Sequence, residues 1–167
     1  MVPELTQSGL ERLAEEVGAR LKARGELLVT AESCTGGWVG QCLTAIAGSS
    51  TWYDGGFITY SNTAKTQFLG VPESTLRRHG AVSEATARAM AQGALARSSA
   101  GWSLAITGIA GPGGGSPRKP VGTVCFAWAR QEGGCVAETC HFEGDREAVR
   151  LQAVGHALRG IRDRLPR

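Results

Sequence analysis

Residues 28–37 read Leu28-Val29-Thr30-Ala31-Glu32-Ser33-Cys34-Thr35-Gly36-Gly37, a short apolar run that stops at small polar residues and a glycine pair. An apolar, helix-like stretch follows, so the pattern predicts a turn from a strand into a helix. The first N–H groups of such a helix have no intrahelical partner, and the helix dipole favours negative charge there. We therefore expect an anionic ligand or a developing oxyanion near Ser33. The alternative is that these small residues only cap and bend the chain.

Helical and strand-like patterns alternate along the rest of the chain. The predicted helices cover 4–24, 38–46, 62–69, 83–97 and 145–165, with a turn or short helix after Pro72. The predicted strands cover 27–31, 57–60, 102–107, 121–129 and 135–142, with Gly55-Gly56 bounding the second and a hairpin joining the last two. Ser83 and Asp145 are the expected N-caps of the last two helices. This order predicts one α/β domain over residues 1–167, a three-layer α/β/α arrangement with a mixed β-sheet flanked by helices.

The composition agrees with one compact domain and excludes several classes of protein. The chain has 167 residues with 42% hydrophobic content, enough to fill a single core. Lys and Arg total 18 against 15 Asp and Glu, without clustering beside aromatic residues, so no nucleic-acid partner is predicted. No apolar run approaches the roughly 20 residues of a membrane span, and the N-terminus lacks a signal-peptide pattern. We therefore expect a cytoplasmic protein without a membrane partner.

The cysteines and histidines do not form a recognisable metal pattern. Five cysteines, at positions 34, 42, 125, 135 and 140, include no C-x-x-C pair, and buried free thiols are predicted. The histidines at positions 79, 141 and 156 lack zinc-ligand spacing, so no metal site is predicted. Cys34 is a candidate nucleophile because it adjoins Ser33, but no imidazole lies nearby in the sequence. A packing role for Cys34 is therefore favoured.

The glycine-rich segment 111–119 matches neither the dinucleotide fingerprint G-x-G-x-x-G nor a P-loop. Repeated glycine is costly to order and proline interrupts regular structure, so a mobile surface loop is predicted. Two interpretations remain open at this point. The segment is either a lid that closes over a ligand or a plain flexible connection.

Five separated motifs occur in one order along the chain. After residues 28–37 come Ala47-Gly-Ser-Ser-Thr51, Gly55-Gly-Phe-Ile-Thr-Tyr-Ser-Asn-Thr-Ala-Lys65, Ala105-Ile-Thr-Gly-Ile-Ala-Gly-Pro-Gly-Gly-Gly115 and Lys119-Pro-Val-Gly-Thr123. Together they resemble the C-terminal domain of the CinA family, the competence/damage-inducible proteins, from about Leu5 to Leu165. Longer family members carry an additional N-terminal domain that resembles molybdopterin-binding proteins. This chain is similar to the free-standing members, which are nicotinamide-nucleotide amidohydrolases.

The resemblance implies hydrolysis of the carboxamide of nicotinamide mononucleotide to nicotinate mononucleotide and ammonia, a salvage step of pyridine nucleotides. No cofactor is expected for this reaction, and a homo-oligomer, a dimer, is the expected assembly. An alternative from a different class is a non-catalytic nucleotide-binding or interaction module linked to competence or DNA damage. A further alternative is an amidase with another substrate.

Amide hydrolysis by nucleophilic attack needs a nucleophile, a base and donors for the oxyanion. Ser33 ends the first predicted strand and Lys65 lies one turn past the second, so neighbouring strands can bring the two together. A Ser–Lys pair works only if the lysine is partly neutral, which requires a pKa lowered from about 10.4. Without the family resemblance, the plainer prediction for Lys65 is an exposed, charged side chain on a helix. The resemblance implies that Ser33, Tyr60 and Lys65 are active-site residues, while the nucleophile and the base stay unassigned.

Further residues are candidates for binding the substrate. Tyr60 can stack on the nicotinamide ring or donate through its hydroxyl, although a half-buried strand tyrosine is the plainer interpretation. Arg146 suits the 5′-phosphate as a bidentate cation, although a first-turn arginine is ordinarily just exposed. The predicted substrate-binding residues are Glu32, Gly36, Gly37, Ser50, Ser61, Thr107, Gly108 and Arg146.

Overall fold

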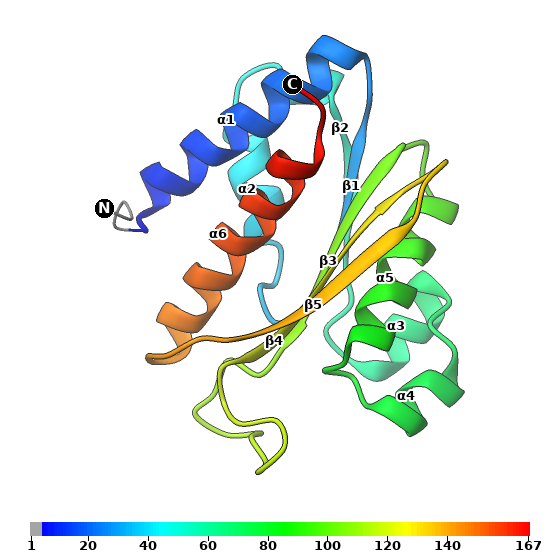
Figure 1. Ribbon diagram of the computed structural model, residues 1–167, viewed down its shortest axis with the longest axis vertical. Coiled ribbons are helices and arrows are strands. Elements are labelled where there is room, and N and C mark those ends of the chain that lie inside the picture. Colours follow the sequence, from blue (N-terminus) through cyan, green and yellow to red (C-terminus); the bar gives the residue numbers. More distant parts are fainter. Residues whose placement is uncertain (1–4) are drawn as a thin grey trace.

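The computed structural model describes residues 5–167, which form one five-stranded sheet with helices on both faces (Figure 1). The strands are β1 (Leu28–Glu32), β2 (Tyr53–Ile58), β3 (Trp102–Gly108), β4 (Thr123–Arg130) and β5 (Cys135–His141), in the spatial order β2-β1-β3-β4-β5. Strands β2, β1 and β3 run parallel, whereas β4 is antiparallel to β3 and to β5. The predicted three-layer α/β fold with a mixed sheet is confirmed.

Three helices cover each face of the sheet. Helices α1 (Gln7–Arg24), α2 (Trp38–Thr44) and α6 (Arg146–Arg164) lie on one face, and α3 (Asn62–Leu69), α4 (Glu73–His79) and α5 (Glu84–Ala96) lie on the other (Figure 1). A short 3₁₀ helix, η1 (Ser49–Thr51), precedes β2. The predicted N-caps are confirmed, since Ser83 accepts from the Thr86 N–H and Asp145 accepts from the Ala148 N–H.

Two apolar layers hold the sheet between the helices. On the α1, α2 and α6 side, large residues such as Leu104, Phe126 and Trp128 fill the core. On the α5 side, the layer is built mostly of alanine together with Met90. Small residues let elements approach closely here, because a Cβ on Gly93 of α5 would lie 2.0 Å from the Leu69 carbonyl oxygen. Small side chains on α5 therefore let this helix lie close to the end of α3.

The second strand begins earlier than its sequence suggests. The prediction of a strand over 57–60 bounded by Gly55-Gly56 is wrong, because β2 starts at Tyr53 and contains the glycine pair. Thr30 Oγ1 and Tyr53 Oη hydrogen-bond across the sheet at 2.8 Å. A Cβ on Gly56 would lie 2.5 Å from that Thr30 oxygen. Gly56 has no side chain that would collide with the Thr30–Tyr53 hydrogen bond, and it lies within the strand.

All five cysteines are free. Cys34, Cys42 and Cys125 are buried as predicted, but Cys135 and Cys140 are only half-buried because they lie on the edge strand β5. Within residues 5–167, no helix has the length and apolar character needed to cross a membrane.

Candidate active site

A cavity of about 260 Å³ opens where the parallel strands end. Ligands of open α/β sheets bind outside the carboxyl ends of the strands, and this cavity occupies that position. Its wall is formed by the segment after β1, the segment after β2, and the end of β3 with the loop that follows it. The lining residues are Ser33, Cys34, Tyr60, Asn62, Lys65, Ala81, Val82, Thr107, Gly108, Ile109, Ala110, Gly111, Gly113, Gly114 and Arg146.

Ser33 is held at the cavity by a tight turn between β1 and α2. Its backbone N–H donates to Ile106 O on β3 at 3.0 Å, and its carbonyl accepts from Gly36 N at 3.0 Å. Gly36 and Gly37 have φ values of 60° and 103°, a left-handed backbone that favours glycine. Arg150 of α6 fixes the turn from outside, since its Nε donates to Cys34 O at 3.0 Å. The two glycines shape the turn but do not line the cavity.

The carboxylate of Glu32 occupies the N-terminus of α2. Its Oε1 accepts from Thr35 Oγ1 at 2.7 Å and from Val39 N at 2.9 Å, and its Oε2 accepts from Gly40 N at 3.1 Å. The chain therefore supplies its own anion to the N–H groups of Val39 and Gly40, so these two donors are not free for an external anion. A developing oxyanion beside Ser33 stays a prediction. Glu32 is buried beneath the turn and does not line the cavity. Its carboxylate fastens the turn that follows Ser33 to the start of α2.

Glu32→Ala is expected to lower the free energy of unfolding by about 3 kcal/mol, because it leaves buried donors unpaired and removes a charge-assisted cap. For a chain of this size, that corresponds to a fall of roughly 6–12 °C in the thermal midpoint, measurable by calorimetry. Glu73→Ala is the matched control, since Glu73 makes only an exposed contact with Arg77 at 3.8 Å. Equal, small effects of both substitutions would contradict the capping role.

Lys65 is buried although it is charged in water, with 1% of its surface exposed. Its Nζ lies 3.0 Å from Ser33 Oγ, 2.9 Å from Thr59 O and 3.2 Å from Tyr60 O. Burial lowers the pKa of the Lys65 amine below its ordinary value of 10.5. Both carbonyl oxygens can only accept, so the two hydrogens of a neutral amine go to them. The nitrogen lone pair is then left for the Ser33 hydroxyl, which is the arrangement that a general base requires.

Tyr60 and Arg146 form the outer wall of the cavity. The Tyr60 side chain is 62% exposed, and its Oη accepts from Arg146 Nη2 at 3.1 Å. Arg146 Nη1 donates to Gly111 O at 2.8 Å, which attaches the glycine-rich loop to the start of α6. Figure 1 shows this loop extending beyond the sheet between β3 and β4. The Tyr60 hydroxyl is thus bonded to the cation, while its backbone carbonyl contacts Lys65.

Cys34 lines the cavity beside Ser33, but its thiol is poorly suited to attack. Burial raises the pKa of the Cys34 thiol to about 11, so the thiolate is scarce near neutral pH. Gly108 packs against it, because a Cβ on Gly108 would lie 3.1 Å from Cys34 Sγ and 2.8 Å from Val124. These contacts support the packing role that the sequence favoured.

The CinA C-terminal domain model matches residues 10–165 of this chain. The chain belongs to the CinA C-terminal domain family. It is 55% identical over 157 residues to the nicotinamide-nucleotide amidohydrolase PncC of Escherichia coli K12, covering 94% of this chain and 95% of that protein. It is 49% identical to the protein of the same name from Pseudomonas putida, covering 89% and 92% of the two chains. The putative competence-damage inducible protein of Symbiobacterium thermophilum is 54% identical, but the match spans 38% of that longer protein.

Solved structures of the CinA family agree with the fold described above. The competence/damage inducible protein CihA from Agrobacterium tumefaciens superposes with a TM-score of 0.89 at 46% identity, covering 91% of this chain and 93% of that one. The competence damage-inducible protein A from Klebsiella pneumoniae gives a TM-score of 0.90 at 42% identity, covering 93% and 96%.

In this CinA domain, the residues expected from the sequence divide into two groups. The cavity brings together Ser33, Tyr60, Lys65, Thr107, Gly108 and Arg146. Thr107 also ties the cavity to the segment before α5, since its Oγ1 donates to Ala81 O at 2.8 Å. Ser61 instead caps α3 by accepting from Ala64 N, and Ser50 lies in η1 before β2, at the opposite end of the parallel strands.

Sequence reasoning missed Asn62 in the cavity wall and Arg150 behind the Ser33 turn. Asn62 directly follows Ser61 in a motif already singled out, so its position carried a signal. Arg150 had no such signal, because α6 meets the Ser33 turn only after folding.

Proposed function

We propose that this protein hydrolyses the carboxamide of nicotinamide mononucleotide to nicotinate mononucleotide and ammonia. The observation that carries the proposal is the buried Ser33–Lys65 pair, 3.0 Å apart, at the edge of a cavity. Relatives at 49% and 55% identity over most of their length are named nicotinamide-nucleotide amidohydrolases, which indicates the substrate. The amidase chemistry and the substrate thus rest on two separate kinds of support.

The geometry supports an acyl-enzyme route. Lys65 Nζ takes the proton of the Ser33 hydroxyl while Oγ attacks the carboxamide carbon. The ammonium that forms stands beside the negative carbonyl oxygen and then returns its proton to the departing amide nitrogen, which leaves as ammonia. A water molecule, deprotonated by the same amine, cleaves the ester to Ser33. Lys65 returns the water proton to Ser33 Oγ, and the released acid gives its remaining proton to solvent. The products are the nicotinate carboxylate, ammonia, one proton and the regenerated hydroxyl.

In the same proposal, the outer wall of the cavity binds the rest of the substrate. The exposed Tyr60 ring offers a stacking face for the pyridine ring. Arg146 uses two of its N–H groups on Gly111 and Tyr60, and a guanidinium has five. The remaining donors suit a 5′-phosphate. The loop that follows β3 supplies the opposite wall through Gly111, Gly113 and Gly114, and its action as a lid stays a prediction.

Arg146→Ala is expected to lower kcat/KM for nicotinamide mononucleotide roughly 10- to 100-fold, since a charge-assisted contact contributes about 1.5–3 kcal/mol. The dephosphorylated riboside should be a poor substrate of the parent, and the substitution should affect it little. Tyr60→Phe is the matched control, because it removes the hydroxyl that Arg146 contacts and leaves the cation. Steady-state kinetics with both substrates provide the measurement. Equal losses on nucleotide and riboside would show that Arg146 holds the loop and does not read the phosphate.

The function itself is tested by incubating the purified protein with nicotinamide mononucleotide, its riboside and free nicotinamide, and by measuring ammonia. Release from the nucleotide, well above that from the other two, is the expected result. Tight binding without ammonia release would instead support the non-catalytic nucleotide-binding module. Ammonia from a different carboxamide in preference to the nucleotide would support another amidase.

The dimer and the cytoplasmic location belong to the same proposal. Small soluble substrates of nucleotide salvage fit a cytoplasmic enzyme, and light scattering of the purified chain measures the assembly directly.

A further inference from the structure

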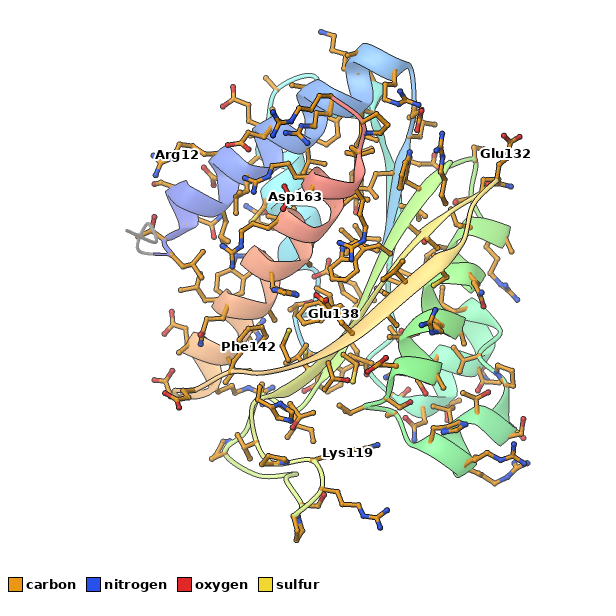
Figure 2. All side chains as sticks on the ribbon, in the orientation of Figure 1. Arg12, Lys119, Glu132, Glu138, Phe142 and Asp163 are labelled. Atoms are coloured by element: carbon orange, nitrogen blue, oxygen red, sulfur yellow. The ribbon has the colours of Figure 1, made fainter. Side chains whose placement is uncertain are left out.

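A second cluster of reactive side chains lies between the edge strand β5 and helix α6. Glu138 and Cys140 are two residues apart on β5, so both side chains project from the same face of the strand. That face is turned to α6, which carries His156 (Figure 2 labels Glu138 beside this helix). None of the three residues lines the cavity at Ser33, and the proposed amide hydrolysis uses none of them.

We propose that this cluster is a zinc site. The ligands are a carboxylate oxygen of Glu138, the Sγ of Cys140 and the Nε2 of His156, and a water molecule completes the tetrahedron.

The spacing of the thiol and the imidazole fits this ion. The three candidate ligand atoms all lie within 4.8 Å of one another. Cys140 Sγ and His156 Nε2 are 3.5 Å apart. Tetrahedral zinc, with Zn–S of about 2.3 Å and Zn–N of about 2.0–2.1 Å, separates a thiolate from an imidazole nitrogen by about 3.6 Å. Glu138 Oε1 hydrogen-bonds to the same nitrogen and would have to exchange that bond for the ion, and its side chain is partly exposed to solvent.

The imidazole is held in place before any ion arrives. The ring of His156 packs against Phe126 with centroids 4.6 Å apart, and against Trp128 and Phe142 with centroids 5.9 and 6.0 Å away. A ligand fixed by packing loses less freedom on binding, so the aromatic contacts favour affinity. The other two ligands stand on a strand whose register with β4 is regular across residues 135–141. A metal ion can reach the cluster from solvent, because the side chains of Glu138 and His156 are both partly exposed.

The donor set selects the metal. A thiolate, an imidazole and a carboxylate together suit zinc, whereas Mg²⁺ and Ca²⁺ prefer oxygen ligands alone. Zinc sites that can be recognised from a sequence place their ligands in pairs that are close along the chain. Here the third ligand comes from a helix 16 residues beyond Cys140 and is supplied by the packing of α6 on β5. A bound ion would join an edge strand to that helix.

The test uses the full-length chain, stripped of metal and titrated with Zn²⁺ by calorimetry and with Co²⁺ by absorption. One ion per chain is expected, with a thiolate-to-cobalt charge-transfer band. Loss of an outer-shell partner typically costs 10- to 100-fold in metal affinity, so Cys140→Ser and His156→Ala should each weaken Zn²⁺ binding by about 100-fold or more. Cys140→Ser should also abolish the cobalt band. Zn²⁺ should raise the thermal midpoint of the parent and not of Cys140→Ser.

Two matched controls lie on the same strand. Cys135→Ser removes a half-buried thiol from the opposite face of β5, and His141→Ala removes an exposed imidazole. Both should keep the parent's affinity and cobalt band. Glu138→Gln supplies a readout if a core substitution fails to fold, since it should weaken Zn²⁺ binding while the cobalt–thiolate band persists. Absence of binding by the parent, or parent-like affinity of Cys140→Ser, His156→Ala and Glu138→Gln, would overturn the proposal.

Discussion

Ser33→Ala is expected to lower kcat for nicotinamide mononucleotide by a factor of about 10⁴ or more, because it removes the nucleophile. The hydroxyl stands 3.0 Å from the Lys65 amine at the cavity wall, and its carbon framework lies in a turn outside the main core. Removing one oxygen there leaves no sizeable cavity, so stability and substrate affinity should stay near those of the parent. Ammonia release gives the turnover, and calorimetric binding of the nucleotide to the variant gives the affinity.

Two control substitutions make this result specific. Ser50→Ala changes an exposed serine at the far end of the parallel strands and should keep the parent's activity. Cys34→Ala removes the neighbouring thiol, whose pKa of about 11 leaves little thiolate, and should change turnover by no more than a few-fold. If Ser33→Ala retained turnover within a few-fold of the parent while Cys34→Ala lost it, the nucleophile would be the cysteine.

The pairing of Ser33 with Lys65 was predictable because it depends on topology. Each residue follows the carboxyl end of one parallel strand, and β1 and β2 are neighbours in the sheet. The sequence positions of the strands therefore placed the two side chains at one edge. What the sequence could not supply was the burial of Lys65, since a lysine one turn into a short helix is usually exposed. The carbonyls of Thr59 and Tyr60 that hold its nitrogen became visible only in the folded chain.

The local sequence pattern failed where contacts outside the motif decide a residue's role. Glu32 ends a strand in the motif that contains Ser33, which suggested contact with the substrate, but its partners are the N–H groups of the following helix. Ser50 stands in a family motif, yet the sheet places it at the opposite end from the cavity. Gly55-Gly56 looked like a strand boundary because glycine weakens strands, but the Thr30–Tyr53 contact requires the small residue within β2.

Lys65→Arg is expected to be nearly as inactive as Lys65→Met, with kcat/KM lowered about 10²–10⁴-fold, if Lys65 acts as the base. A guanidinium keeps its proton at any working pH, so it preserves the charge and cannot accept the Ser33 proton. Methionine keeps a similar length and removes the titratable nitrogen. Circular dichroism and nucleotide binding check that each variant folds, since the site is tightly packed. Substantial activity of the arginine variant would leave Lys65 with electrostatic support only.

The pH profile of the parent separates the same two roles without a substitution. Burial places the pKa of the Lys65 amine below 10.5, so raising the pH through that lowered pKa frees the lone pair. As a base, Lys65 makes kcat/KM rise about tenfold per pH unit below its pKa and level off above it.

The same lowered pKa makes stability depend on pH. Between the lowered pKa and 10.5, the Lys65 amine binds more protons in the unfolded chain than in the folded one. The contribution of Lys65 to the free energy of unfolding therefore grows with pH across that window and is lost as pH falls through the lowered pKa. Lys65→Met should remove this stability dependence. A parent profile that instead falls with rising pH would show that the charged amine is the active form.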